Sequence, residues 1–311
     1  METNIPILNE FLYYLLCVKS YSKRTAIGYS RDLQRFFKFI IEEKQWNIRE
    51  NLLNVFLLGS VKTSDIYKFL ICLNYYQNNG PNTRRRILSA IKTFYKWLFL
   101  KYKHLLRDRQ NPTLKIPNIE TIQRLPKYIQ LDKAKSLENI FNKDNSRNPI
   151  RNNTIIILFL NCGLRISELI NINIEDINFD KKELIVMGKG NKERIVFLNK
   201  TSMAALEKYL NTLDTNKGAL FTNLKGKRLC NNSIENICQK AFKLAGLEEY
   251  NYTTHTLRHT AATYMYKSTK DILLVKEFLG HSSIMSTEIY THVINDSVKN
   301  AVNKNPLSNY K

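Results

Sequence analysis

The stretch that decides the fold lies near the C-terminus and has two parts. The first reads T-H-T-L-R-H-T-A-A-T-Y-M over residues 254–265, and the second reads L-G-H-S-S-I-M-S-T-E-I-Y-T-H-V over residues 279–293. Apolar residues over 272–279 predict a helix between them, and Gly280 is typical of a residue that ends one. Three of the chain's five histidines stand in this stretch before Tyr290, so it concentrates side chains that can do chemistry.

These side chains suit chemistry on a phosphate. His255 and Arg258 are three residues apart and share one face of a helix, while Tyr290 follows His281 by nine residues. Arginine forks onto phosphate oxygens, imidazoles move protons near neutral pH, and a phenol can act as a nucleophile. Each residue alone is more often a surface or packing residue, so the hypothesis depends on their combination in one segment.

The remaining histidines and the cysteines receive no chemical role. His259 follows Arg258 directly and is interpreted as structural, and His292 has no assigned role. The chain has no Cys-x-x-Cys and no His-Glu-x-x-His, so the sequence predicts no metal site. Its five scattered cysteines predict reduced thiols in a cytoplasmic protein.

Two segments further upstream carry candidates of the same kind. In C-G-L-R-I-S-E-L, Arg165 stands at the start of a predicted helix, two residues after Gly163, which allows a tight approach. In G-K-G-N-K-E-R, Lys189 lies between two glycines in a turn that joins two predicted strands and could deliver an ammonium to a ligand. An ordinary hairpin turn is the simpler interpretation, and Lys192 has the weaker claim.

Hydrophobic periodicity predicts a helical first half and a mixed second half. The first-half helices are predicted over residues 6–20, from a Ser22 cap to residue 40, over 65–76 and from Pro81 onward. In the second half, helices are predicted over residues 155–160, 164–169, 201–213 and 231–246, strands over 177–179, 184–187 and 194–198, and an amphipathic tail over 298–302. Between the halves, residues 112–126 contain three prolines and are predicted to be a linker.

The charge of the chain predicts an anionic partner. Its 311 residues carry 48 Lys and Arg against 27 Asp and Glu, a formal net charge of +21, which favours nucleic acid. Residues 1–126 contribute 21 basic and 9 acidic side chains, so both halves are basic and one partner is expected to touch both. No apolar run reaches the ~18 residues of a membrane span and no signal-peptide pattern is present, so neither membrane insertion nor secretion is expected.

Together these boxes resemble those of the tyrosine recombinases, also called the phage integrase family, and most closely the bacterial Xer enzymes. The resemblance covers nearly the whole chain, and every catalytic box stands in order. It implies a fold that is mainly α with a small antiparallel β-sheet, divided between two domains. A helical, SAM-like core-binding domain is expected over 1–111, a linker over 112–126, and an α+β catalytic domain with a C-terminal tail over 127–311.

The resemblance also implies a reaction, the cutting and rejoining of DNA through a 3′-phosphotyrosyl intermediate without ATP, metal or any other cofactor. Tyr290 would be the nucleophile, and Arg165 and Arg258 would clamp the non-bridging phosphate oxygens. Lys189 would protonate the departing 5′-oxygen and His255 would act as acid and base, while His281 would bond the phosphate.

The partners that the resemblance implies are a double-stranded DNA recombination site and further copies of the enzyme. A tetramer of this chain, or of this chain and a paralogue, would hold two such sites, and a DNA translocase or accessory protein is a further expected partner. Phosphate contacts in the first domain are expected from the basic faces of two helices. The candidates are Arg31, Arg35, Arg84, Arg85, Arg86 and Lys92.

Several functions stay open at this point. Resolution of chromosome or plasmid dimers is the preferred biological role, with an integrase or excisionase of a phage, transposon or other mobile element as the alternative. A type IB topoisomerase shares the phosphotyrosine chemistry, but the L-G-H-S-S-I box argues against it. A DNA-binding module without activity is a further alternative, which the intact set of six catalytic candidates disfavours.

Overall fold

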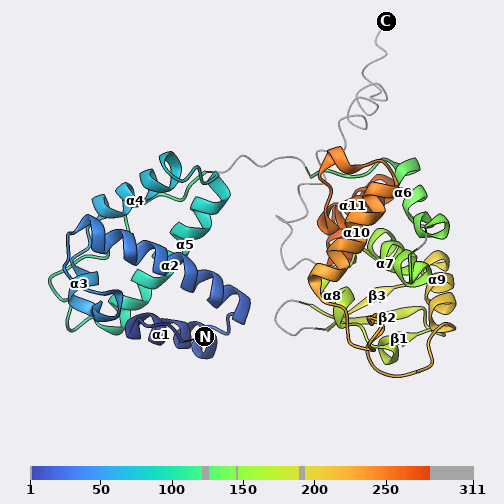
Figure 1. Cartoon of the computed structure of the whole chain (residues 1–311), viewed down its shortest axis with the longest axis horizontal. Helices are drawn as coiled ribbons and strands as arrows, with labels where there is room; N and C mark the ends of the chain where they lie inside the picture. Colours follow the sequence, from blue (N-terminus) through green and yellow to red (C-terminus); the bar gives the residue numbers. More distant parts are fainter. Residues whose placement is uncertain (1, 121–125, 145, 189–192, 281–311) are drawn as a thin grey trace, which may run out of the picture. The chain divides into compact units, whose positions relative to one another are not determined.

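The chain folds into two compact units, residues 1–123 and residues 124–311 (Figure 1). The computed structural model describes residues 2–120, 126–144, 146–188 and 193–280. In that part the chain is mainly helical with one small antiparallel sheet, which confirms the predicted fold class. None of its helices is long and apolar enough to cross a membrane.

The first unit is a helical bundle built around two long helices. Its elements are α1 (Pro6–Tyr13), a π-helical turn (Tyr14–Val18), α2 (Lys23–Glu43), a 3₁₀ turn (Glu50–Leu52), α3 (Val55–Gly59), α4 (Thr63–Tyr75) and α5 (Pro81–Lys101). The predicted cap at Ser22 is confirmed, because its side chain accepts a hydrogen bond from the Thr25 amide. The single helix predicted over 6–20 is wrong in its second half, where the π-helical turn replaces α-helical bonding.

Aromatic side chains fill the core between α1, α2 and α5. Phe94 of α5 meets Phe11 at 5.3 Å and Phe37 at 5.2 Å between ring centroids, both edge to face. Edge-to-face contacts of this kind add to the free energy that burial already provides. The α2 and α5 helices are thereby held together, and each keeps its opposite, basic face at the surface.

The first part of the predicted linker packs on this unit. The Thr63 hydroxyl donates to the Pro112 carbonyl at 2.9 Å, and the Lys92 ammonium donates to the Ile116 carbonyl at 2.6 Å. Ile116 is itself buried in the core of the first unit. The chain is therefore bound to the bundle to about residue 118, while the domain limits 1–111 and 127–311 stay predictions.

The second unit places helices around a three-stranded sheet. Its helices are α6 (Leu131–Leu137), α7 (Pro149–Cys162), α8 (Ile166–Asn171), α9 (Lys200–Leu210), α10 (Asn231–Leu244), α11 (Thr254–Thr269) and α12 (Ile272–Leu279), with 3₁₀ turns at Ile140–Lys143, Ile174–Asp176 and Glu248–Tyr250. The apolar α7 is the central helix and packs against both α9 and α11. Gly163 ends this helix, and its carbonyl accepts a hydrogen bond from Arg258.

The sheet has the order β1 (Ile177–Asn178), β2 (Glu183–Met187) and β3 (Glu193–Phe197), and all neighbours are antiparallel. The three strands predicted from the sequence are confirmed. Leu184 pairs with Val196 and Val186 pairs with Arg194. Residues two apart on a strand share a face, so Arg194 stands on the same inward face as the buried Val196.

Candidate active site

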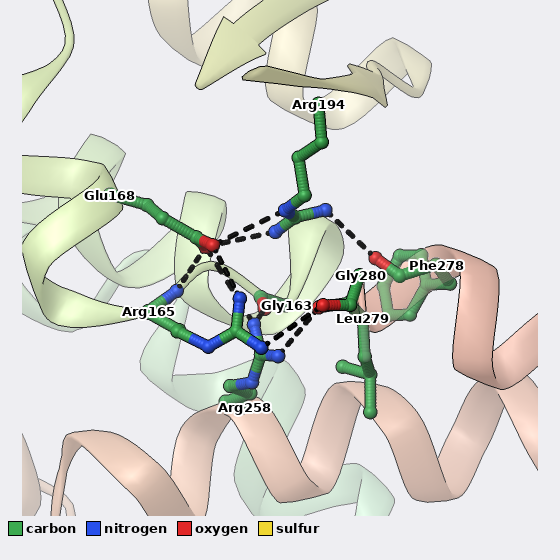
Figure 2. A network of polar contacts seen from close by, with 8 residues as sticks. All are labelled: Gly163, Arg165, Glu168, Arg194, Arg258, Phe278, Leu279 and Gly280. Atoms are coloured by element: carbon green, nitrogen blue, oxygen red, sulfur yellow. Dashed lines mark hydrogen bonds and ion pairs between the residues drawn. The ribbon is translucent and has the colours of Figure 1, made fainter. Parts of the chain in front are cut away.

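Two of the predicted catalytic residues come from different helices and meet at one carboxylate. Arg165 is the N-cap of α8, and Arg258 lies in the second turn of α11. Glu168 of α8 stands between them, with a side chain that is 0% exposed (Figure 2). Residues so far apart in sequence are brought together by the packing of α11 on α7.

Arg165 is held to Glu168 at both its backbone and its side chain. The Arg165 amide donates to Glu168 Oε2 at 2.7 Å, so the Glu168 side chain satisfies one of the free amides at the start of α8. Its Nη1 donates to Glu168 Oε1 at 2.6 Å, and its Nη2 donates to the Gly280 carbonyl at 3.2 Å. The side chain remains 29% exposed, so part of it is open to solvent.

Arg258 is the more deeply placed of the two arginines. Its side chain is 6% exposed, and its Nη1 lies 3.7 Å from Glu168 Oε2. The same nitrogen donates to the Gly163 carbonyl, and Nη2 donates to the Leu279 carbonyl at 2.7 Å. Arg258 therefore joins the end of α7 to the end of α12, and both arginines lie beside the residue that precedes His281 (Figure 2).

A third arginine binds the same carboxylate. Arg194 of β3 reaches Glu168 with Nη2 at 2.9 Å and with Nε at 3.2 Å. Burial raises the pKa of Glu168, but the hydrogen bonds and charge of Arg194, with the Arg165 amide, outweigh burial and leave that pKa below its ordinary value. Glu168 is thus an anion at neutral pH, and three guanidinium groups around one carboxylate leave a local excess of positive charge.

Two glycines allow this close packing. Gly163 ends α7 with φ +57°, and a Cβ at this position would lie 2.8 Å from the Phe278 ring. Gly280 ends α12 with φ +61°, and its Cβ would lie 2.5 Å from Arg194 Cδ. Both backbones adopt the left-handed region that favours glycine, and both carbonyls accept hydrogen bonds from the arginine pair. The helix stop predicted at Gly280 is confirmed.

The histidines of α11 differ in their surroundings. His255 lies in the first turn and is exposed, three residues before Arg258 on the same helix. His259 is half-buried, and burial lowers its pKa to about 4, with the charges of His255 and Arg258 adding to the shift. At neutral pH His259 is an uncharged ring, as a structural residue would be. In the described part of the chain no cluster of three metal-ligating side chains occurs.

The other predicted catalytic residues, Lys189, His281 and Tyr290, lie outside the described residues, as do Lys192 and His292. Glu168 and Arg194 are the residues that sequence reasoning missed. Both residues stand inside the boxes quoted above, and a Glu three residues after the N-cap can accept a hydrogen bond from the N-cap amide, as Glu168 does from Arg165. The burial of the Glu168 side chain could not be predicted from the sequence. Because it is buried between the arginines, Glu168 lies at the centre of the site and not at the surface.

The candidate DNA-binding residues of the first unit fall into two groups. Arg31 and Arg85 are exposed on α2 and α5. Several of the others bond within the protein: Arg35 donates to Gln77, Arg86 pairs with the buried Asp32, and Lys92 holds Ile116 and Asn118. Exposure at the surface favours a phosphate contact, so Arg31 and Arg85 are the better placed candidates.

Comparison with known proteins gives consistent results over both units. The model of the phage integrase family matches residues 127–296, and that of the phage integrase N-terminal SAM-like domain matches residues 8–101. Tyrosine recombinase XerC of Caldanaerobacter subterraneus is 37% identical, with 97% of this chain and 87% of the relative covered. Tyrosine recombinase XerD of Staphylococcus saprophyticus is 31% identical, with 96% and 97% covered.

Solved structures share the fold. XerA recombinase has a TM-score of 0.51 at 26% identity, with 96% of this chain and 98% of that chain covered. XerH recombinase in its post-cleavage complex with a palindromic difH substrate has a TM-score of 0.70 at 19% identity, with 97% of each chain covered. A lambda integrase fragment bound to a core site has a TM-score of 0.66 at 15% identity, with 89% and 94% covered.

Proposed function

The chain belongs to the phage integrase family, the tyrosine recombinases, and on that premise we propose how its arginine site cuts DNA. The protein is a site-specific recombinase that breaks and rejoins DNA strands. A recombinase of the Xer type fits the relatives better than the recombinase of a mobile element. Double-stranded DNA is its partner.

The observation that carries the proposed site is the meeting of Arg165 and Arg258 at Glu168. Each guanidinium nitrogen Nη bears two hydrogens, so a bond from Nη1 or Nη2 of Arg165 to its internal partner leaves a second hydrogen for a ligand. The buried carboxylate fixes the two groups before DNA arrives. A phosphate placed beside the partly exposed Arg165 would gain donors where negative charge builds in the transition state.

Tyr290 would supply the nucleophile. Its phenolic oxygen attacks the scissile phosphorus, the bond from phosphorus to the 5′-oxygen breaks, and a 3′-phosphotyrosyl ester forms. The phenolic proton passes to a base, and the departing 5′-oxygen takes a proton to become a hydroxyl. A 5′-hydroxyl of the partner DNA then reverses the step and releases the tyrosine. One phosphoester replaces another at each step, so no ATP is needed.

Proton transfer would fall to residues around the arginine pair. Lys189 is the proposed donor to the 5′-oxygen, and His255 is the proposed acid and base toward the tyrosine. His255 suits this because it is exposed at the start of α11, one helical turn from Arg258. His281, which follows Gly280 directly in the sequence, would hydrogen-bond the phosphate. The proposed role of Arg165 and Arg258 is to hold the non-bridging oxygens.

The proposed biological role is resolution of chromosome or plasmid dimers. Four subunits, of this chain alone or with a paralogue, would hold two DNA sites, because strand exchange needs four cleavages. This role is supported by relatives named XerC and XerD, which are similar to this chain over nearly their whole length. A DNA translocase or accessory protein would complete the system.

The test uses a DNA site nicked near the scissile phosphate, so that cleavage releases a short fragment and traps the covalent adduct. The wild-type protein should form an adduct that survives on denaturing gels. Tyr290→Phe should bind the same DNA with unchanged affinity and form none, because phenylalanine has no oxygen to attack phosphorus. An adduct in the Phe variant would refute Tyr290 as the nucleophile.

A further inference from the structure

We propose that Arg194 is a positioning residue for DNA cleavage, which holds Arg165 and Arg258 in place through Glu168 and fixes the end of α12. The proposal rests on the function given above, since it concerns the same phosphate site. Among the described residues the hydrogen bonds of Arg194 go to Glu168 and to the Phe278 carbonyl, so it would act through the groups that bind the phosphate.

The register of the sheet places this arginine where a charge is costly. Arg194 pairs with Val186 on the inward face of β3, and its side chain is only 14% exposed. Its inward neighbours Leu184, Val186 and Val196 are all buried apolar residues. A guanidinium in this position loses hydration and needs full hydrogen bonding in return. The partners that it finds there explain why this residue type stands in the sheet.

Those partners belong to the site. Nη2 and Nε of Arg194 fork onto the two oxygens of Glu168, at 2.9 and 3.2 Å. Nη1 donates to the Phe278 carbonyl at 3.0 Å, in the last turn of α12. A fork onto both oxygens fixes the plane of the carboxylate, which a single bond would leave free to turn. One side chain of β3 therefore orients α8 and the end of α12 together (Figure 2).

The orientation of Glu168 decides where the phosphate-binding groups lie. Oε1 accepts from Arg165 Nη1 at 2.6 Å, and Oε2 accepts from the Arg165 amide at 2.7 Å while lying 3.7 Å from Arg258 Nη1. A carboxylate that turned about its axis would lose one of these bonds or shift both guanidinium groups. Since misplacement by about 1 Å can cost roughly 10²-fold in rate, the fork bears directly on cleavage.

Contact with Gly280 closes a ring of interactions. The aliphatic part of Arg194 lies against this glycine, because a Cβ there would meet Arg194 Cδ at 2.5 Å. The Gly280 carbonyl in turn accepts a bond from Arg165 Nη2. The ring runs from Arg194 to Phe278 and Gly280, on to Arg165, and back through Glu168. His281 follows Gly280 directly in the sequence. The ring therefore fixes the residue from which the chain continues toward Tyr290.

The experiment compares Arg194→Met and Arg194→Lys in the full chain on the nicked DNA site. Arg194→Met should bind DNA with unchanged affinity and form the covalent adduct about 10²-fold more slowly. Arg194→Lys keeps the charge but cannot fork onto both oxygens of Glu168. Its rate of adduct formation should therefore lie between those of the wild-type protein and Arg194→Met. Arg151→Met is the matched control. Arg151 is also half-buried and donates to a carbonyl, that of Thr222, but from the opposite end of α7, so its loss should leave cleavage by the folded protein unchanged.

Two further readouts separate positioning from general stability. Among the described residues, the charged groups that face Glu168 are Arg165, Arg194 and Arg258. Removing Arg194 should therefore raise the pKa of Glu168 and move the acid-side decline of cleavage to higher pH. In a Glu168→Gln background, Arg194→Met should cause little further loss, because the two residues act as one unit.

The outcomes distinguish this proposal from the one on which it rests. If the wild-type protein formed no adduct, the proposed function would be overturned. If Arg194→Met formed the adduct at the wild-type rate with the wild-type pH profile, the positioning role alone would be overturned. A loss of the same size with and without Glu168→Gln would also overturn it. If Arg194→Met does not fold, Arg194→Lys takes its place in the test. A wild-type rate and pH profile in Arg194→Lys would then overturn the positioning role.

Discussion

A buried carboxylate at the centre of three arginines makes the stability of this site depend on pH. The Glu168 side chain is fully covered, yet its pKa is lowered, because Arg194 and the Arg165 amide stabilise the anion more than burial penalises it. A lowered folded pKa means that the folded state holds the proton more weakly than the unfolded state. The stabilisation is therefore present above the ordinary pKa of 4.5 and is lost as pH falls through the lower, folded value.

This gives a prediction for Glu168→Gln. The free energy of unfolding of the wild-type protein should exceed that of the variant most above pH about 5, and the difference should shrink as pH falls below 4.5. Urea unfolding of both proteins between pH 3 and pH 7 would measure it, on the ~3–5 kcal/mol scale of a broken buried ion pair. A difference that stays constant across this range would mean that Glu168 keeps its ordinary pKa in the folded state.

Lys189 carries a prediction that separates chemistry from phosphate binding. A general acid matters only while the 5′-oxygen leaves, so Lys189→Ala should keep its DNA affinity and cleave roughly 10²–10⁴-fold more slowly. Replacing the bridging 5′-oxygen with sulfur gives a leaving group that needs little protonation. Cleavage of that substrate should be rescued in Lys189→Ala and remain slow in Arg165→Ala, because the proposed role of Arg165 is on the non-bridging oxygens. Rescue of Lys192→Ala in place of Lys189→Ala would move the acid to Lys192.

At the scale of helices and strands, local signals predicted much of the second unit. The helix over 272–279 and its stop at Gly280 need only apolar spacing and a glycine, and the structure has both. The helix expected from Leu164 instead begins at Ile166, because Arg165 is a cap with extended backbone. That shift of two residues places the Arg165 amide on Glu168, a detail that depends on the capping bond and not on periodicity.

Tertiary packing explains what local signals missed. Short helices such as α3 and α6 have too few residues for a periodic pattern, and the π-helical turn at Tyr14–Val18 has no such signal. The inward register of Arg194 contradicts the usual alternation of apolar and polar residues, so the sequence alone favours a surface position. Only the position of Glu168 in space, set by α8, explains an arginine on the buried face.

The turn between α7 and α8 gives a prediction at this scale. Gly163→Ala would strain a backbone at φ +57° and also force a methyl group to 2.8 Å from the Phe278 ring. Gly246→Ala is the matched control, because its φ is +65° and its Cβ would meet nothing within 4 Å. The control should lose about 1 kcal/mol of unfolding free energy from strain, and Gly163→Ala a further ~1–3 kcal/mol from overpacking.

Urea unfolding measures both losses, and DNA cleavage gives a second comparison. The Gly163 carbonyl accepts a bond from Arg258, so Gly163→Ala should also slow adduct formation, whereas Gly246→Ala should not. Equal losses of stability in the two variants would mean that α12 yields to the added methyl group at little cost.

At the scale of the whole molecule, we expect DNA affinity and cleavage chemistry to be divided between the two units. Each unit has a hydrophobic core of its own, and the arginine cluster lies entirely in the second. The first unit, residues 1–123, contributes 20 basic side chains against 9 acidic ones, and α2 and α5 carry exposed arginines among them. Such an arrangement suits a bundle that holds phosphates along the DNA while the second unit cuts one of them.

The exposed arginines Arg31 and Arg85 are therefore expected to set the salt dependence of binding. Each phosphate contact contributes about 0.9 to the slope of log affinity against log salt, so Arg31→Ala with Arg85→Ala should lower the slope by roughly 1.8. Lys92→Ala is the control, because Lys92 lies on α5 seven residues after Arg85. Its ammonium already bonds the Ile116 and Asn118 oxygens, so its loss should weaken the fold of the first unit and leave the slope unchanged.

Fluorescence anisotropy on one DNA site between 50 and 300 mM salt would measure these slopes for the three proteins. The double variant should keep the rate of adduct formation at saturating protein, because the groups that act on the scissile phosphate are untouched. A slope equal to that of the wild-type protein would mean that α2 and α5 turn these arginines away from the DNA. A change in slope for Lys92→Ala would mean that its bonds to residues 116–118 give way when DNA binds, so that the lysine becomes a phosphate ligand.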